Sequence, residues 1–172
     1  MHTTKNSSAL HYLFHSTPIG LAVIATSQQK VRFVYIGKDE APLLELLHNA
    51  CLDSHLSPLE ERESLPYREW IDHLIDPTEE VVRIGIDPRG SPFQQSVWRY
   101  LLTIPRGAVR SYADVASGIG NIKATRAVAN ACGQNPIALA IPCHRVVRKG
   151  GAIGGYRWGI DKKRWLLDRE RS

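Results

Sequence analysis

The sequence predicts an α+β protein in which a small N-terminal α/β lobe with a short antiparallel sheet precedes a mostly helical lobe containing a helix-turn-helix. Three observations predict this arrangement. Segments rich in β-branched and aromatic residues stand near the N-terminus. Helix-start and helix-stop signals dominate the second half, and the charge changes sign between the halves. The 172 residues suffice for two such lobes, which we place at residues 1–85 and 86–172.

The N-terminal lobe contains candidate strands followed by candidate helices. The strand candidates are residues 11–15, 20–26 and 31–36, all bounded by turn-forming residues. The helix candidates are residues 41–50, which carry four leucines on one expected face, and residues 66–75. The tetrapeptide at 27–30 suits a hairpin connection, and the acidic stretch at 51–65 is expected to be a loop.

The first two helices of the C-terminal lobe have recognisable starts. Ser91 before Pro92 predicts an N-cap followed by proline at the first helical position, and this helix should end at residues 104–107. Ser111 and Asp114 have the spacing of a capping box and predict a short second helix.

A tight glycine turn at residues 118–121 leads into a third helix. We expect Asn121 to cap this alanine-rich helix, which should run to Cys132. Two helices joined in this way suggest a helix-turn-helix, although many helical hairpins never touch DNA. The small and polar residues that fit a DNA groove are Lys123, Thr125, Arg126 and Asn130. A last helix is expected from Asp161.

The charge distribution favours a polyanionic partner for the second half. Residues 1–80 carry 6 basic and 12 acidic side chains, whereas residues 81–172 carry 16 basic and 5 acidic ones. Such a basic surface suggests nucleic acid, with a merely solubilising surface as the alternative. No apolar run approaches the ~20 residues of a membrane span, and no signal peptide is recognised. We therefore expect a cytoplasmic protein that binds no membrane.

The cysteine pattern argues against disulfides and metal. The three cysteines, at positions 51, 132 and 143, are too few and odd in number for a disulfide framework. No pair has the C-x-x-C spacing and the histidines are scattered, so we expect no metal site. Cys51 and Cys132 suit small buried residues.

Cys143 is the strongest candidate for chemistry. A buried apolar run at residues 137–141 leads toward it, and His144 and Arg145 follow at once. Positive neighbours lower the pKa of a thiol and enrich the nucleophilic thiolate. An inert buried cysteine and a cysteine hydrolase remain alternatives at this point. Adjacent side chains of an extended chain point apart, so contact with His144 needs an unusual turn or a bridging water.

The motif Ile141-Pro-Cys-His-Arg-Val-Val147 resembles the active site of the O6-alkylguanine-DNA alkyltransferases, also called methylated-DNA–protein-cysteine methyltransferases. The form at residues 155–159 is most similar to the Ada-type subgroup. The other matching segments, in family order, are residues 93–98, 104–107, 111–112, 123–128, 135–136, 155–159, 165–167 and Glu170. The resemblance implies a ribonuclease-H-like supporting lobe followed by a winged-helix-like DNA-binding and catalytic lobe.

The resemblance implies direct repair of double-stranded DNA by a monomer without a cofactor. The Cys143 thiolate would displace guanine from the alkyl carbon on O6 and keep the alkyl group, so each molecule would act once. O4-methylthymine is implied as a further substrate. The chain lacks the room and the cysteines for the zinc domain that Ada-type proteins often carry, so a complete protein of this length is not expected to act as a transcription activator. The alternative is a non-catalytic, lesion-sensing or regulatory DNA-binding protein.

The resemblance also implies roles for individual side chains. His144 would activate the thiol through a water, and Glu170 would orient His144. Tyr112 would protonate the leaving guanine and help to rotate its nucleotide, while Asn135 would hold the turn before the active site. Arg126 would fill the gap left by the flipped nucleotide. The implied pocket residues are Val146, Tyr156, Arg157 and Trp158.

Overall fold

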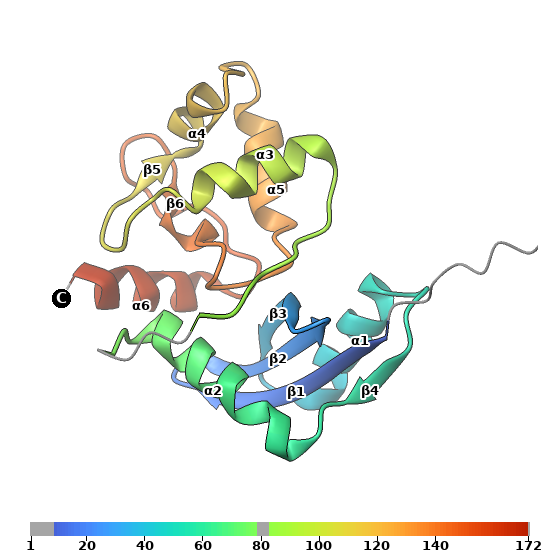
Figure 1. The fold of residues 1–172 in the computed structure, drawn as a ribbon. Coiled ribbons are helices and arrows are strands. Elements are labelled where there is room, and N and C mark those ends of the chain that lie inside the picture. The colour runs from blue at the N-terminus through green and yellow to red at the C-terminus, as the bar shows by residue number, and fades with distance from the viewer. Residues whose placement is uncertain (1–8, 79–82, 172) are drawn as a thin grey trace, which may run out of the picture. The chain divides into compact units, whose positions relative to one another are not determined.

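The computed structural model describes residues 9–78 and 83–171, which form two compact units that divide between Asp87 and Pro88 (Figure 1). Among these residues, the first unit contains a four-stranded sheet and two helices, whereas α-helices are the main elements of the second. The mixed α+β class predicted from the sequence is confirmed. No helix of the described residues is long and apolar enough to cross a membrane.

The sheet of the first unit has the strand order β3-β2-β1-β4. Its strands are β1 (Leu10–Thr17), β2 (Gly20–Ser27), β3 (Lys30–Gly37) and β4 (Leu56–Pro58). The pairs β1–β2 and β2–β3 are antiparallel, as expected, whereas β4 adds a parallel edge beside β1. Gln28 and Gln29 make the predicted hairpin turn with φ of 51° and 61°, the left-handed conformation that a tight two-residue hairpin demands.

Two helices pack on this sheet, α1 (Glu40–Ala50) on β2 and β3, and α2 (Glu61–Ile75) on β1. The expected loop at 51–65 is wrong, because it contains β4 and the first turn of α2. Pro66 lies inside α2 although it cannot donate a backbone hydrogen bond there. Burial of Trp70, Ile71 and Ile75 offsets that loss.

The described part of the second unit contains four α-helices and two very short strands. The helices are α3 (Pro92–Leu101), α4 (Tyr112–Gly118), α5 (Thr125–Gly133) and α6 (Ile160–Arg171). The parallel strands β5 (Arg110–Ser111) and β6 (Val146–Val147) stand before α4 and after a 3₁₀ turn, η1 (Cys143–Arg145).

Both predicted capping signals are confirmed. At α3, the Gln94 N–H donates to Ser91 Oγ over 3.2 Å, and the Ser91 N–H donates to Gln94 Oε1 over 2.7 Å. At α4, Ser111 and Asp114 make the same reciprocal pair at 3.1 and 2.8 Å. These bonds satisfy backbone donors that the first helical turn leaves without partners.

The helix-turn-helix pair α4–α5 is present, but its expected cap is wrong. α5 begins at Thr125 after Ala124, with no side-chain cap. The Asn121 backbone carbonyl instead accepts from the Ala124 N–H over 2.9 Å and closes the preceding turn. α5 packs on α3 and α4 and buries Val128 and Ala131, so its opposite face is open to solvent.

Candidate active site

Cys143 stands at the first position of η1, after the buried run at residues 137–141. Its side chain is buried, with 6% of the residue exposed. The Asn135 amide donates one N–H to Cys143 Sγ over 3.1 Å and another to the Ile141 carbonyl over 2.8 Å. Its Oδ1 accepts from the Ile137 N–H over 2.9 Å. Asn135 thus uses both donors and its acceptor to tie the end of α5 to the thiol.

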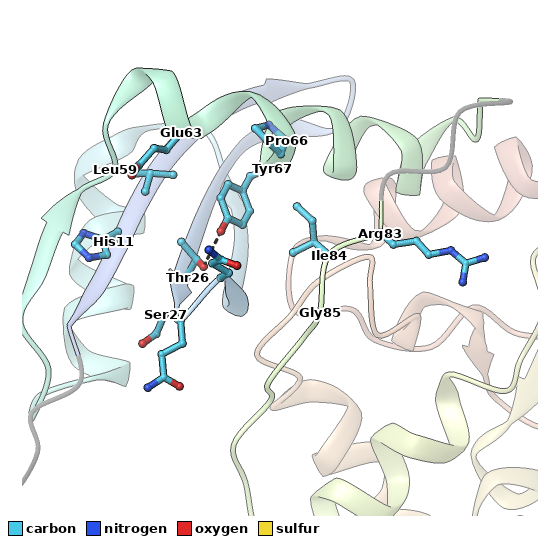
Figure 2. Close-up of a pocket in the computed structure, with 12 residues that line it drawn as sticks. His11, Thr26, Ser27, Leu59, Glu63, Pro66, Tyr67, Arg83, Ile84 and Gly85 are labelled. Atoms are coloured by element: carbon cyan, nitrogen blue, oxygen red, sulfur yellow. Dashed lines mark hydrogen bonds between the residues drawn. The ribbon is translucent and has the colours of Figure 1, made fainter.

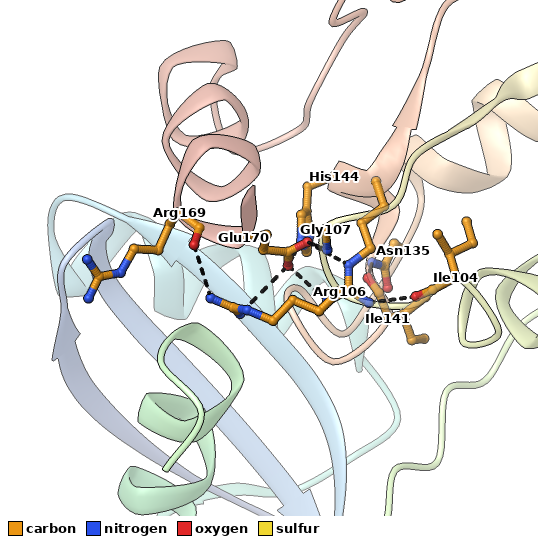
Figure 3. A network of polar contacts seen from close by, with 9 residues as sticks. Ile104, Arg106, Gly107, Asn135, Ile141, His144, Arg169 and Glu170 are labelled. Atoms are coloured by element: carbon orange, nitrogen blue, oxygen red, sulfur yellow. Dashed lines mark hydrogen bonds and ion pairs between the residues drawn. The ribbon is translucent and has the colours of Figure 1, made fainter. Parts of the chain in front are cut away.

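The turn at η1 sends His144 toward the last helix, where its Nε2 lies 2.8 Å from Glu170 Oε1. Both side chains are almost fully buried, with 2% and 3% exposed. Arg145 makes a bidentate pair with the same carboxylate, at 2.9 Å for both nitrogens, and donates to the Ile104 carbonyl over 2.7 Å. Figure 3 shows the Glu170 carboxylate beside His144 within this polar network.

Gly107 completes the surroundings of Glu170. Its N–H donates to Glu170 Oε2 over 3.3 Å, and its φ of 78° lies in the left-handed region that favours glycine. A Cβ atom there would stand 3.0 Å from the Glu170 carbonyl oxygen. The residue therefore allows the backbone to approach α6 closely enough for the hydrogen bond.

The charges of this cluster follow from its contacts. Burial alone would raise the pKa of Glu170, but the hydrogen bonds from His144 and Arg145 lower it to about 2. Burial lowers the pKa of His144 despite its carboxylate partner. His144 is therefore neutral at rest and donates through Nε2 to an ionised Glu170, which leaves Nδ1 as an acceptor. The Nδ1 atom is buried and has no hydrogen-bond partner among the described residues.

The expectation of a lowered thiol pKa is wrong. Burial raises the pKa of Cys143, and the Asn135 hydrogen bond and the cations Lys163 and Arg157 oppose this only in part. Arg145, which the sequence places two residues away, is instead engaged by Glu170. The thiol therefore holds its proton at rest, and a reaction at sulfur needs a base.

A cavity of about 350 Å³ adjoins the thiol. Its lining residues are Tyr112, Ala129, Asn130, Cys132, Gly133, Cys143, Arg148, Gly155, Tyr156 and Arg157. The cavity thus brings five of the predicted site residues together. Val146 and Trp158 do not line it: Val146 is fully buried, and the buried Trp158 ring carries the Arg157 guanidinium 4.7 Å from its centroid.

Tyr112, the first residue of α4, lies half-buried in the cavity wall. Burial and the nearby thiols Cys132 and Cys143 raise its pKa to about 12, although Arg148 acts in the opposite direction. Its hydroxyl is therefore protonated and able to donate.

The residues predicted for DNA contact lie on the solvent-exposed side of the helix-turn-helix. They are Lys123, Thr125, Arg126 and Asn130, and all four are exposed. Asn130 also lines the cavity, whereas Arg126 does not. One turn of α5 therefore separates an exposed arginine from the wall of the thiol cavity.

Lys163 is a candidate functional residue that the sequence reasoning missed. It is fully buried in α6, and its Nζ donates to the carbonyls of Val146 over 2.6 Å and Gly155 over 3.1 Å. Burial lowers its pKa, and the nearby thiols Cys143 and Cys132 oppose that shift. A signal existed: Lys163 lies three, four and seven residues before the buried Leu166, Leu167 and Glu170, which is the spacing of one helix face.

A larger cavity, of about 490 Å³, lies within the first unit. Figure 2 shows Thr26 and Tyr67 facing each other there, where the Thr26 hydroxyl donates to Tyr67 Oη over 3.2 Å. None of the described residues that line it is a cysteine or a predicted site residue. Among the described residues, no group of histidine, cysteine or carboxylate side chains is arranged to hold a metal ion.

Comparison with known proteins bears on this arrangement of thiol, amide and buried histidine–carboxylate pair. The sequence profile of the 6-O-methylguanine DNA methyltransferase, DNA binding domain, matches residues 92–172. An inducible methylated-DNA–protein-cysteine methyltransferase of Bacillus subtilis is 36% identical over 140 residues, which cover 80% of this chain and 78% of that protein. The chain belongs to the methylated-DNA–protein-cysteine methyltransferase family.

Two further proteins are similar to most of this chain. The bifunctional transcriptional activator and DNA repair enzyme Ada of Escherichia coli is 38% identical over 162 residues. Those residues are 94% of this chain but 46% of Ada, so the chain spans about half of that curated relative. The crystal structure of Mycobacterium tuberculosis OGT in complex with DNA has a TM-score of 0.75 and 32% identity, and the match covers 94% of this chain and 92% of that one.

Proposed function

We propose that this chain repairs double-stranded DNA by irreversible transfer of the alkyl group from guanine O6 to its own Cys143. The observation that supports this most is the buried thiol beside a cavity, with the Asn135 amide on sulfur and the next residue, His144, paired with Glu170. A new sulfur–carbon bond forms as the carbon–oxygen bond breaks. The thioether product is stable, so each molecule reacts once.

The reaction needs the thiol proton removed, because Cys143 holds it at rest. In our proposal a water accepts this proton as it passes another to His144 Nδ1, and the Glu170 carboxylate stabilises the imidazolium that forms. Asn135 donates to the sulfur and stabilises its negative charge before attack.

The guanine leaves with excess negative charge, and the Tyr112 hydroxyl protonates it. The raised pKa of Tyr112, about 12, keeps its hydroxyl protonated at neutral pH. Lys163 lies with its Nζ 6.0 Å from the centre of the Tyr112 ring and supplies a buried positive charge for the developing anion.

The alkyl carbon of a paired guanine is out of reach of a buried thiol, so the nucleotide must leave the stack. We assign DNA contact to the exposed side of the helix-turn-helix, with Arg126 filling the gap in the stack and Lys123 and Thr125 on the backbone. Asn130, which belongs to both the exposed face and the cavity wall, marks the route of the flipped base.

Intact mass tests the proposal directly. The protein is mixed with an equimolar duplex that contains one O6-methylguanine. The expected result is a gain of one methyl group, with no gain for Cys143→Ala. An unchanged mass under conditions where the duplex binds would instead support the non-catalytic DNA-binding alternative. Repeated turnover of an ester or amide would support a cysteine hydrolase.

The remaining assignments concern substrate range and setting. We assign O4-methylthymine as a second substrate, tested by the same mass gain with a duplex carrying that base. We also propose a monomer that acts in the cytoplasm without a cofactor, in which residues 1–85 support the catalytic lobe at 86–172.

DNA binding should weaken as salt rises, since a basic surface releases counterions from phosphates. Salt-independent binding would contradict the assigned contact surface.

A further inference from the structure

The active site contains two buried polar atoms that no described residue satisfies, His144 Nδ1 and Tyr156 Oη. The two rings are neighbours, with centroids 6.5 Å apart and planes at 80°. Native proteins pair nearly all buried polar atoms with protein or with ordered water. Two such atoms on adjacent rings therefore point to one shared partner that is not a side chain.

The Tyr156 hydroxyl is on the buried side of its ring rather than in the cavity. The residue contributes to the cavity wall, yet its oxygen has no exposed surface. A base that enters the cavity would therefore meet the ring before the hydroxyl. Burial, followed by the proximity of Cys143 and Glu170, raises the pKa of Tyr156 well above its usual range. The hydroxyl thus lies among the groups of the proton relay and keeps its own proton.

We propose that Tyr156 is a positioning residue, whose hydroxyl and His144 Nδ1 together hold the water that carries the Cys143 proton. This inference rests on the water relay of the proposed function and adds its third member. An internal water makes about three hydrogen bonds. Here it donates to His144 Nδ1, accepts from the Cys143 S–H and takes its third bond from Tyr156 Oη. As the sulfur proton passes to the water, the water passes one to Nδ1.

The Tyr156 hydroxyl matters because a water with only two hydrogen bonds, to His144 and Cys143, can rotate. A third hydrogen bond fixes the water with an oxygen lone pair directed at the Cys143 S–H. Removing the hydroxyl should leave the ring, the cavity wall and the His144–Glu170 pair in place. The expected defect is then in deprotonation of Cys143 alone.

The test is the variant Tyr156→Phe, assayed by alkylation of Cys143 with iodoacetamide across a range of pH. This reagent needs only the thiolate, so the assay is independent of any activity on DNA. We expect alkylation at neutral pH to slow about tenfold and its pH profile to move to higher pH, the size of effect expected for loss of one hydrogen bond to the water. Tyr100→Phe, a half-buried tyrosine of α3 outside the cavity, is the matched control and should keep the wild-type profile.

A double variant separates positioning from general loosening of the site. In a His144→Ala background the relay is already broken, so adding Tyr156→Phe should slow alkylation no further. An unshifted profile for Tyr156→Phe would overturn the inference, and so would an equal slowing with and without His144. Wild-type protein that fails to gain a methyl group from DNA would contradict the proposed function, while the iodoacetamide profile would still decide the role of Tyr156.

Discussion

Among the described residues, a histidine–carboxylate pair is found in each unit, and the two pairs have nearly the same length. His15 Nε2 lies 2.9 Å from Asp72 Oδ1 in the first unit, and His144 Nε2 lies 2.8 Å from Glu170 Oε1 in the second. Their surroundings differ: 53% of the Asp72 side chain is exposed, against 3% for Glu170. Water screens the first pair, whereas burial makes the second sensitive to every nearby charge. Burial, rather than hydrogen-bond length, separates a surface contact from a candidate catalytic pair.

The cavities of the two units also differ in the chemical groups that line them rather than in size alone. The larger one, in the first unit, is lined mainly by amides, hydroxyls and apolar groups. The smaller one, in the second unit, contains two thiols and two tyrosines. Volume alone therefore does not select the candidate site, whereas groups with strongly shifted pKa values gather at the smaller cavity.

The largest expected difference between the units concerns their cysteines. Cys143→Ala should abolish methyl transfer from O6-methylguanine DNA, because burial raises the pKa of Cys132, the other thiol that lines the cavity, and the proposed water relay serves only Cys143. Cys51→Ala, in the first unit, should react like the wild type. Intact mass after incubation with duplex measures both, and methyl uptake by Cys143→Ala would contradict the assigned acceptor.

Glu170→Gln should be the next most damaging change. It leaves the partly buried Arg145 without its buried charge partner and removes the anion that stabilises a protonated His144. Breaking a buried ion pair in this way costs about 3–5 kcal/mol of unfolding free energy, and we expect methyl transfer to slow by ~10²-fold or more. Asp72→Asn, the matched change at the exposed pair, should cost about 0–1 kcal/mol. Urea denaturation and single-turnover kinetics measure the two effects.

Acid should act on the buried pair in a defined direction. Glu170 has its pKa lowered from 4.5 to about 2, so the folded state binds its proton less readily than the unfolded state. The stability from this shift is fully present above pH 4.5 and is lost as pH falls toward about 2. Glu170→Gln should flatten this part of the stability profile. An equally steep loss in Glu170→Gln would assign the acid sensitivity to other groups.

Arg126→Ala should separate nucleotide flipping from chemistry. Unstacking a base costs a few kcal/mol, so loss of the side chain that fills the gap should slow repair of duplex DNA by ~10–100-fold. Reaction with free O6-methylguanine or O6-benzylguanine base should change little, because nothing has to be flipped. Arg62→Ala, an exposed arginine of the first unit, is the control. Equal losses with duplex and free base would remove the proposed role of Arg126.

Lys163→Met should produce the smallest of these effects. The substitution keeps much of the buried stem and removes the cation near Cys143 and Tyr112. We expect methyl transfer to slow about tenfold and the pH needed for thiolate formation to rise. The exposed Lys38→Met in the first unit should do neither. A rate profile of Lys163→Met that matches the wild type would make the buried lysine a structural residue only.

Local signals predicted the helices well where capping chemistry was explicit. Ser91 and Ser111 begin α3 and α4 as expected, because the bonds that cap a helix join residues three apart. The start of α2 could not be predicted in this way, since it lacks a side-chain cap and includes Pro66. Its apolar face is satisfied only by packing on the sheet, which local sequence does not reveal.

The candidate site likewise has features that the sequence could predict and features that only the tertiary contacts reveal. Cys143 and His144 could be named from one motif, and Asn135 and Glu170 from the family resemblance. The direction of the thiol pKa could not, because Arg145 turns away to Glu170, 25 residues further along the chain. The burial of Lys163 was not predicted because a lysine is rarely fully buried, although its spacing places it on the same helix face as the buried leucines of α6.

The sequence by itself determined the order of the two lobes, the basic character of the second and the choice of Cys143 as the candidate thiol, because these depend on composition and short-range spacing. Only the tertiary structure decided which charges meet. Folding buries His144 against Glu170, raises the pKa of Cys143 and leaves His144 Nδ1 and Tyr156 Oη on adjacent rings. These properties arise from desolvation and from contacts between distant segments, and neither exists until the chain has folded.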